Sequence, residues 1–184
     1  SSSGAAMKGR IIAAGAFVFC VMSQAGDAPR IVTPFGIGPV KIGMTIPEAE
    51  KALGHKLTIN YVAAGSEACG NAWTADTSRQ GFGFMVEDGI VTRIDIGLPK
   101  RNSGYRPFVT AEGIGVGSTE AAVRKAYGKR LKIEAHPYLD DQGHYLIVDE
   151  PDHRHGIIFE TDLTKVTSFR TGLYPAVGYI EGCA

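Results

Sequence analysis

The sequence lacks an excess of charge of either sign. Its 184 residues include 19 Lys and Arg against 19 Asp and Glu, so the formal net charge is zero. A nucleic-acid-binding surface usually shows as a basic excess, so we expect no nucleic-acid partner. Cysteine is scarce, with three residues and no C-x-x-C pair, which excludes a disulfide-dense miniprotein and a thioredoxin-like redox site. The 44% of hydrophobic residues excludes an intrinsically disordered chain.

Familiar catalytic motifs are missing as well. No serine lies in a G-x-S-x-G elbow, and no H-E-x-x-H pair offers helical zinc ligands. The glycines of residues 113–117 (GIGVG) precede a predicted helix but lack the spacing of a dinucleotide-binding or phosphate-binding loop. We interpret them as a strand and the entry to that helix. The protein is therefore expected not to be an enzyme and to need no cofactor.

The longest apolar run lies near the N-terminus and is shorter than the ~20 residues that span a bilayer. Lys8 and Arg10 precede it, residues 11–22 are apolar or small, and it closes on Ser23-Gln24-Ala25. This order is typical of a secretory signal peptide; a buried helix or an uncleaved anchor is the alternative. Residues 1–6 precede the first methionine and are expected to be vector-derived. Cleavage after Ala25 would leave a chain of net charge −2 without a transmembrane span, in the bacterial periplasm or secreted.

Cleavage would also remove Cys20 and leave Cys69 and Cys183. Cys20 follows the bulky residues 17–19 (FVF) and not the small residue that a bacterial lipoprotein needs, so lipid attachment is not expected. In an oxidising compartment the two remaining cysteines favour a disulfide between Cys69 and Cys183. Two buried free thiols are the alternative.

Two segments of the remaining chain recur at nearly the same offset. Residues 43–54 (GMTIPEAEKALG) align without a gap on residues 117–128 (GSTEAAVRKAYG). Residues 84–97 (FMVEDGIVTRIDIG) align in the same way on residues 159–172 (FETDLTKVTSFRTG). Self-similarity at a fixed period indicates a duplication. We predict a first α+β repeat at residues 26–98, a linker at 99–110 and a second α+β repeat at 111–184, after a segment 1–25 that is removed.

Each repeat is predicted to open with a short helix and to continue as four strands. Thr45 and Thr119 are the expected N-caps, and Gly54 and Gly128 the expected stops. A helix followed by an antiparallel meander, twice over, is an α+β fold, expected here to form one continuous sheet. Apolar and polar residues alternate in 90–96, so one sheet face should be buried and the other open. The expected strands are 57–62, 69–75, 82–86, 90–96, 131–136, 144–149, 156–161 and 165–170, with a turn at 140–143.

The helix motif resembles that of a known family. Residues 42–45 (IGMT), followed by Glu48 and Leu53-Gly54, are similar to the signature of the small outer-membrane lipoprotein of the β-barrel assembly machine, although Ser118 stands in the place of Met44 in the second repeat. The tandem helix and meander resemble the β-lactamase-inhibitor-protein-like fold. The chain after residue 25 also resembles a group of uncharacterised exported bacterial proteins that end in a Gly-Cys motif like Gly182-Cys183. Both characterised families act by protein–protein contact, which is what the resemblance implies for this chain.

The densest polar segment is residues 149–155 (DEPDHRH). His153 and His155 lie two residues apart on an extended segment and could bind one metal ion together with Asp149, or with His144 from the neighbouring strand. The spacing is not one of the strong Cys/His ligand patterns, and a solvated hairpin loop is the favoured interpretation. A periplasmic metal-binding or small-ligand-binding protein that uses this His-rich hairpin is the alternative function.

Aromatic side chains are the groups most able to anchor a protein contact. Tyr105 in the linker, Tyr138 and Tyr174 are the candidates, whereas Trp73 lies on a predicted strand and is expected in the core. The leading hypothesis is an exported, non-catalytic protein that binds a protein partner through the open sheet face and the loops. Such a protein could be an enzyme inhibitor or an envelope accessory factor.

Overall fold

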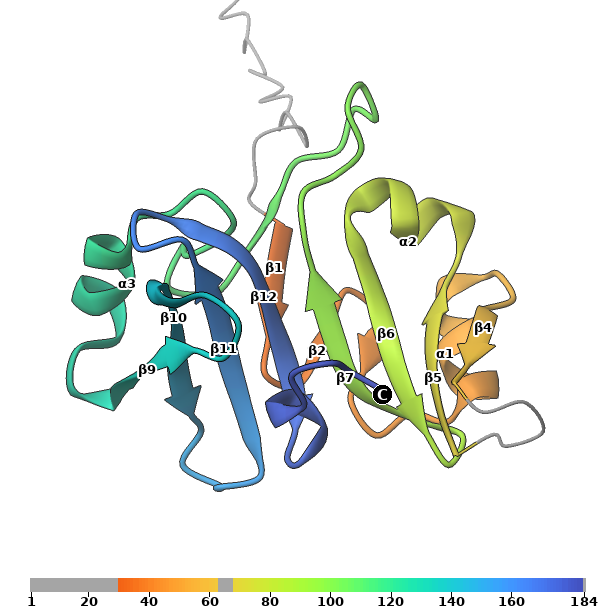
Figure 1. The fold of residues 1–184 in the computed structure, drawn as a ribbon. Coiled ribbons are helices and arrows are strands. Elements are labelled where there is room, and N and C mark those ends of the chain that lie inside the picture. Colours follow the sequence, from red (N-terminus) through yellow and green to blue (C-terminus); the bar gives the residue numbers. More distant parts are fainter. Residues whose placement is uncertain (1–29, 63–67, 184) are drawn as a thin grey trace, which may run out of the picture.

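A computed structural model describes residues 30–62 and 68–183 (Figure 1). The predicted signal peptide, residues 1–25, lies outside this part of the chain. The described part has a mixed α+β fold that is mostly antiparallel sheet. Within it, no helix has the length and hydrophobicity to cross a membrane.

Eight strands form one antiparallel sheet, in the order β4-β5-β6-β7-β12-β11-β10-β9. The last strand of residues 58–96 therefore pairs with the last strand of residues 131–173 at the centre of the sheet, where Asp95 lies opposite Arg170 and Ile96 opposite Phe169. The strands are β4 (Thr58–Tyr61), β5 (Cys69–Trp73), β6 (Phe82–Glu87), β7 (Ile90–Ile96), β9 (Leu131–His136), β10 (Asp140–Asp149), β11 (His155–Thr161) and β12 (Val166–Leu173).

Strand β10 begins earlier than the sequence suggests. Residues 140–143, expected as a turn, belong to this strand, and the turn lies at residues 137–139. The pairing with β9 is irregular between Asp140 and His144, as in a β-bulge. Gly143 permits this irregularity, because a Cβ there would lie 2.6 Å from the carbonyl oxygen of Thr161.

The two predicted helices are present with their predicted caps. Helix α1 (Ile46–Leu53) starts with a capping box, in which the Thr45 hydroxyl accepts from the Glu48 amide and the Glu48 carboxylate accepts from the Thr45 amide at 2.8 Å. Helix α3 (Glu120–Tyr127) starts at Thr119, whose hydroxyl accepts from the Ala122 amide. Because the signals that start these helices lie within four residues, the sequence alone was enough to find them.

The structure also contains elements that the sequence analysis did not predict. Helix α2 (Ala75–Gln80) replaces the end of the strand expected at 69–75. A small second sheet has the order β3-β2-β1-β8. Its first three strands follow one another in the chain, whereas β8 comes from far along the chain and pairs in parallel with β1. Its last strand lies inside the segment predicted as a linker, 99–110, and carries the buried Phe108. The strands are β1 (Arg30–Thr33), β2 (Gly36–Ile37), β3 (Val40–Lys41) and β8 (Phe108–Val109).

The main core lies on one face of the large sheet. Helices α1 and α3 and the small sheet cover this face, and they contribute Ala49, Val123 and Val32 to the same apolar cluster as the sheet residues. Phe84, Phe159 and Phe169 are the largest buried side chains on the sheet side. The opposite face, predicted to be open, carries the candidate site, and Ser78 of α2 lies at one margin of this site.

Candidate binding face

The chain after β12 turns back across the open face of the sheet. We call residues 174–183 the C-terminal strap; it includes the 3-10 turn η2 (Ala176–Gly178) and is drawn in dark blue in Figure 1. Its end is fixed by a disulfide between Cys183 and Cys69 of β5, with a Cα–Cα distance of 5.5 Å. The disulfide predicted from the cysteine count is therefore present, and it joins the strap to the far half of the sheet.

Arg93 of β7 holds the middle of the strap. Its Nη1 donates to the carbonyl oxygens of Ala176 at 3.1 Å and Tyr179 at 2.9 Å. The rest of the guanidinium binds the Asp95 carboxylate, through Nε at 3.1 Å and Nη2 at 2.8 Å. The Arg93 side chain is only 7% exposed, whereas the Asp95 side chain is 40% exposed. The acid of this pair therefore faces solvent and the base does not.

Arg170 of β12 makes the second attachment of the strap. Its Nε donates to the carbonyl oxygen of Val177 at 2.7 Å, and its Nη1 donates to Glu160 of β11. The guanidinium also lies over the ring of Tyr145, 4.9 Å from the centroid. Its Nη2 is buried and has no acceptor within the described chain. The Arg170 side chain is 4% exposed and that of Glu160 is 24% exposed, so here too the carboxylate is the accessible partner.

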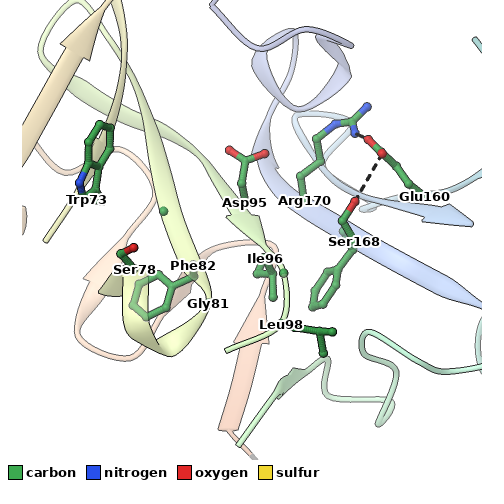
Figure 2. Close-up of a pocket in the computed structure, with 13 residues that line it drawn as sticks. Trp73, Ser78, Gly81, Phe82, Asp95, Ile96, Leu98, Glu160, Ser168 and Arg170 are labelled. Atoms are coloured by element: carbon green, nitrogen blue, oxygen red, sulfur yellow. Dashed lines mark hydrogen bonds and ion pairs between the residues drawn. The ribbon is translucent and has the colours of Figure 1, made fainter. Parts of the chain in front are cut away.

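Beside the strap, the open face is hollowed between β5 and β11. We call this the central hollow; it has a volume of about 530 Å³ and continues into a second depression of about 450 Å³ that reaches the strap. Figure 2 shows Trp73 on one side and Asp95, Arg170 and Glu160 on the other. The residues that line both depressions are Trp73, Gly83, Asp95, Glu160 and Arg170.

Strand pairing explains why the hollow lies there. Gly83 of β6 pairs with Asp95, which pairs with Arg170 on the next strand. On the other side, Ala72 pairs with Phe84, which places the next residue, Trp73, opposite Gly83. Trp73, Gly83, Asp95 and Arg170 thus form one row across four strands, and Gly83 leaves a gap in this row because it has no side chain. A Cβ built on Gly83 would contact only the carbonyl oxygen of Ala72, at 3.4 Å. The backbones of Trp73 and Asp95 are therefore two strand spacings apart, roughly 10 Å.

Trp73 is a correction to the sequence analysis. We expected it in the core, but residues of one strand alternate between faces, and in β5 it is Gly70 and Ala72 that are buried. Trp73 is partly exposed and lines the central hollow. The alternation in the segment 69–73 (CGNAW) was too weak a hydrophobic signal to assign the face, because glycine and alanine are its only inward residues.

The three predicted tyrosine contacts lie in three different places. The Tyr105 hydroxyl donates to Asp76 of α2 at 2.7 Å, and this hydrogen bond raises the pKa of Tyr105. The Tyr138 hydroxyl donates to Glu181 of the strap, which raises the pKa of Tyr138. Tyr138 is 61% exposed and so remains available to a partner.

Tyr174, the third, is half-buried under the start of the strap. Its hydroxyl donates to Asp149 of β10 at 2.7 Å, and burial first of all raises its pKa. Its ring packs against a small apolar cluster that includes Ile147, Ile158 and Val177. This tyrosine therefore fastens the strap to the sheet, and protein contact through it stays a prediction.

The four candidate metal ligands do not all come together. His144 pairs with Thr161 at one end of β11, whereas His155 lies at the other end, six residues or roughly 20 Å away. The Nδ1 of His155 lies 2.6 Å from Asp152, whose pKa is lowered to about 2 by the amide of Arg154 and by His155.

The other two candidates lie near the same end as His155. Asp149 is bound by Lys132 and Tyr174, which lowers its pKa despite partial burial. His153 lies in the hairpin loop with a positive φ of 53°. Across residues 30–62 and 68–183, no three His, Cys, Asp or Glu side chains lie close enough together to hold a metal ion.

Comparisons with known proteins give no family. No known protein family matches the sequence, and no curated protein matches it either. Among solved structures, this chain is similar to a DUF4309 family protein, YjgB, from Bacillus subtilis. The two share 13% sequence identity with a TM-score of 0.42, over 78% of this chain and 88% of YjgB.

Proposed function

We propose that the protein is an exported, non-catalytic binding protein that engages a protein partner through the open sheet face beside the C-terminal strap. The observation that carries the proposal is the central hollow, which places a partly exposed indole and two accessible carboxylates on a rigid sheet. Buried, well-packed surroundings with a central aromatic residue are typical of interaction hot spots. The disulfide between Cys69 and Cys183 supports export, since such bonds persist in oxidising compartments.

The same proposal includes the duplication. Strands β4 to β7 and β9 to β12 follow α1 and α3 in the same order and meet at the centre of the sheet, which supports two repeats at 26–98 and 111–184 joined by 99–110. The likeness to the β-lactamase-inhibitor-protein-like fold stays a prediction, as does the role of the protein as an inhibitor or an envelope accessory factor.

The test is affinity capture with residues 26–184 as bait, from periplasm and culture medium, read by mass spectrometry. Three baits are compared: the unchanged protein, Ser168→Arg in the central hollow, and Lys125→Glu on the exposed side of α3. We expect a stoichiometric protein that Lys125→Glu retains and Ser168→Arg loses. A partner that binds all three baits equally would show that the contact lies elsewhere, and the proposal that the open face binds the partner would be rejected.

The rival function is metal binding by the hairpin around His153. It is supported by the location of His153, His155 and Asp149 near one end of the β10–β11 hairpin. Calorimetric titration of zinc and copper into the intact protein and into His153→Ala tests it. Saturable heat that disappears in the variant would support the rival function, and no heat in either protein would reject it.

A further inference from the structure

We propose that the central hollow receives a basic side chain, an arginine or a lysine, that projects from the partner protein. This inference rests on the proposed function and specifies the chemistry of the partner. Three features of the hollow support it: its accessible charge, its shape and the aromatic side chain at its margin.

The accessible charge of the hollow is negative, although two ion pairs at the hollow contain one arginine and one carboxylate each. Arg93 and Arg170 are 7% and 4% exposed, and their donors point to strap carbonyls and to their own acids. Asp95 and Glu160 keep 40% and 24% of their side chains exposed. Glu181 of the strap adds a third carboxylate at the rim. A cation therefore gains more than an anion on entering.

The shape of the hollow fits a single inserted side chain. Gly83 removes one side chain from the row between Trp73 and Asp95, and the β6 backbone forms the floor. A guanidinium or ammonium group in this gap would have the indole of Trp73 on one side and the Asp95 carboxylate on the other. A cation within about 6 Å of an indole centroid is attracted by the ring, most strongly when the site excludes water.

Trp73 makes a direct experiment possible, because it is the single tryptophan of the chain. Its fluorescence, and its indole N–H signal in NMR, report on the hollow alone. The probe is N-acetyl-arginine methylamide, with N-acetyl-citrulline methylamide as the neutral probe of nearly the same shape. We expect a saturable change with the arginine probe and at least tenfold weaker binding of the citrulline probe, the order expected for losing a charge-assisted contact.

Three variants locate the site. Gly83→Leu fills the gap while leaving both charged groups of the Asp95–Arg93 pair in the protein, and it should abolish the response, while Asp95→Asn should weaken binding about tenfold. Glu134→Gln removes the same charge from an exposed position of β9 on the same face and should change nothing. Thermal unfolding of each variant shows whether it is folded. If Asp95→Asn fails to fold, Gly83→Leu and the citrulline comparison still decide.

Three results would overturn the inference: equal binding of both probes, binding that Gly83→Leu leaves unchanged, or no binding of either. These outcomes are separable from the proposed function. If Ser168→Arg loses the partner and neither probe gives a response, the open face remains the binding face and the basic side chain is rejected. If the arginine probe gives a response and no partner is captured, the hollow remains a site for a basic group and the protein partner is rejected.

Discussion

The Nδ1 of His144 on β10 lies 2.8 Å from a carboxylate oxygen of Glu120, the first residue of helix α3. The same oxygen accepts a hydrogen bond from Thr161, and the other lies 3.4 Å from Arg124. Glu120 is 8% exposed, so these partners replace water around its charge. The carboxylate also lies at the N-terminus of α3, where the helix dipole favours negative charge. This cluster connects helix α3 to strands β10 and β11 of the large sheet.

The first prediction concerns the acid of this cluster. Burial raises the pKa of Glu120, but hydrogen bonds from Thr161 and His144 outweigh it, and the pKa is lowered from the ordinary 4.5. Glu120→Gln should lower the free energy of unfolding by about 1–3 kcal/mol at neutral pH.

The pH dependence has a definite sign. Because the folded-state pKa of Glu120 is lowered, its stabilisation is complete above the ordinary value of 4.5 and is lost as the pH falls through the folded value. The difference between the wild type and Glu120→Gln in urea unfolding should therefore shrink below about pH 4. Glu134→Gln, an exposed acid, serves as the control. A difference that grows on acidification would contradict the assignment.

The second prediction concerns the strap disulfide. The bond closes a loop of 114 residues, and its removal in Cys69→Ser/Cys183→Ser should lower the free energy of unfolding by about 2–5 kcal/mol. Denaturant unfolding of the wild type with and without reductant, beside the double variant, measures this. Intact-mass analysis after thiol alkylation should show no modified cysteine in residues 26–184 unless reductant is added. Two alkylated thiols in the unreduced protein would contradict the disulfide.

The third prediction tests whether Arg93 holds the strap. Arg93→Met keeps an unbranched apolar stem but removes the donors to Ala176 and Tyr179, so it should cost about 2–3 kcal/mol of stability. Hydrogen exchange of the Gly178 and Tyr179 amides, which are bonded within the strap, should accelerate at the same time.

Arg79→Met is the matched control for this substitution. The Arg79 side chain is 58% exposed and pairs with Asp76 on the surface of α2, so its loss should change stability by less than about 1 kcal/mol. Exchange rates in the strap that stay unchanged in Arg93→Met would show that the disulfide and the hydrogen bonds of Arg170 and Tyr174 position the strap without Arg93.

The sequence predicted those features that depend on neighbouring residues. The caps at Thr45 and Thr119 and the alternation in β7 are local, and the cysteine count left one pairing once residues 1–25 were set aside. Helix α2 had a local signal that went unused, because Thr74 caps it and Gly81 ends it. A six-residue helix directly after a strand shows too short a period to stand out.

The candidate site could not be predicted, because distant residues form it. Arg93 reaches carbonyl oxygens more than 80 residues away, and a main-chain acceptor leaves no mark in the sequence. The pairing of β1 with β8 likewise joins residues far apart in the chain through main-chain atoms, so the sequence did not indicate it. The hollow depends on Gly83, and the role of this glycine can be recognised only when its neighbours on the adjacent strands, Trp73 and Asp95, are known.

The last prediction compares two glycines of the central strands. Gly172 of β12 packs directly on β7: a Cβ there would lie 2.2 Å from the carbonyl oxygen of Thr92 and 2.8 Å from the Cα of Arg93, and its φ is 150°. Backbone atoms cannot move aside as a flexible side chain can, so Gly172→Ala should separate the strands and destabilise the protein by about 2–4 kcal/mol.

Gly83→Ala is the matched substitution on β6, which pairs with the other side of β7. Its Cβ would have ordinary contact distances, and alanine restricts the unfolded chain more than glycine does, so the variant should be neutral or more stable by up to about 1 kcal/mol. Thermal and urea unfolding of both variants gives the comparison. Equal effects at the two positions would mean that strands β7 and β12 are not as close at Gly172 as the structure places them, and that the two halves of the sheet meet in another way.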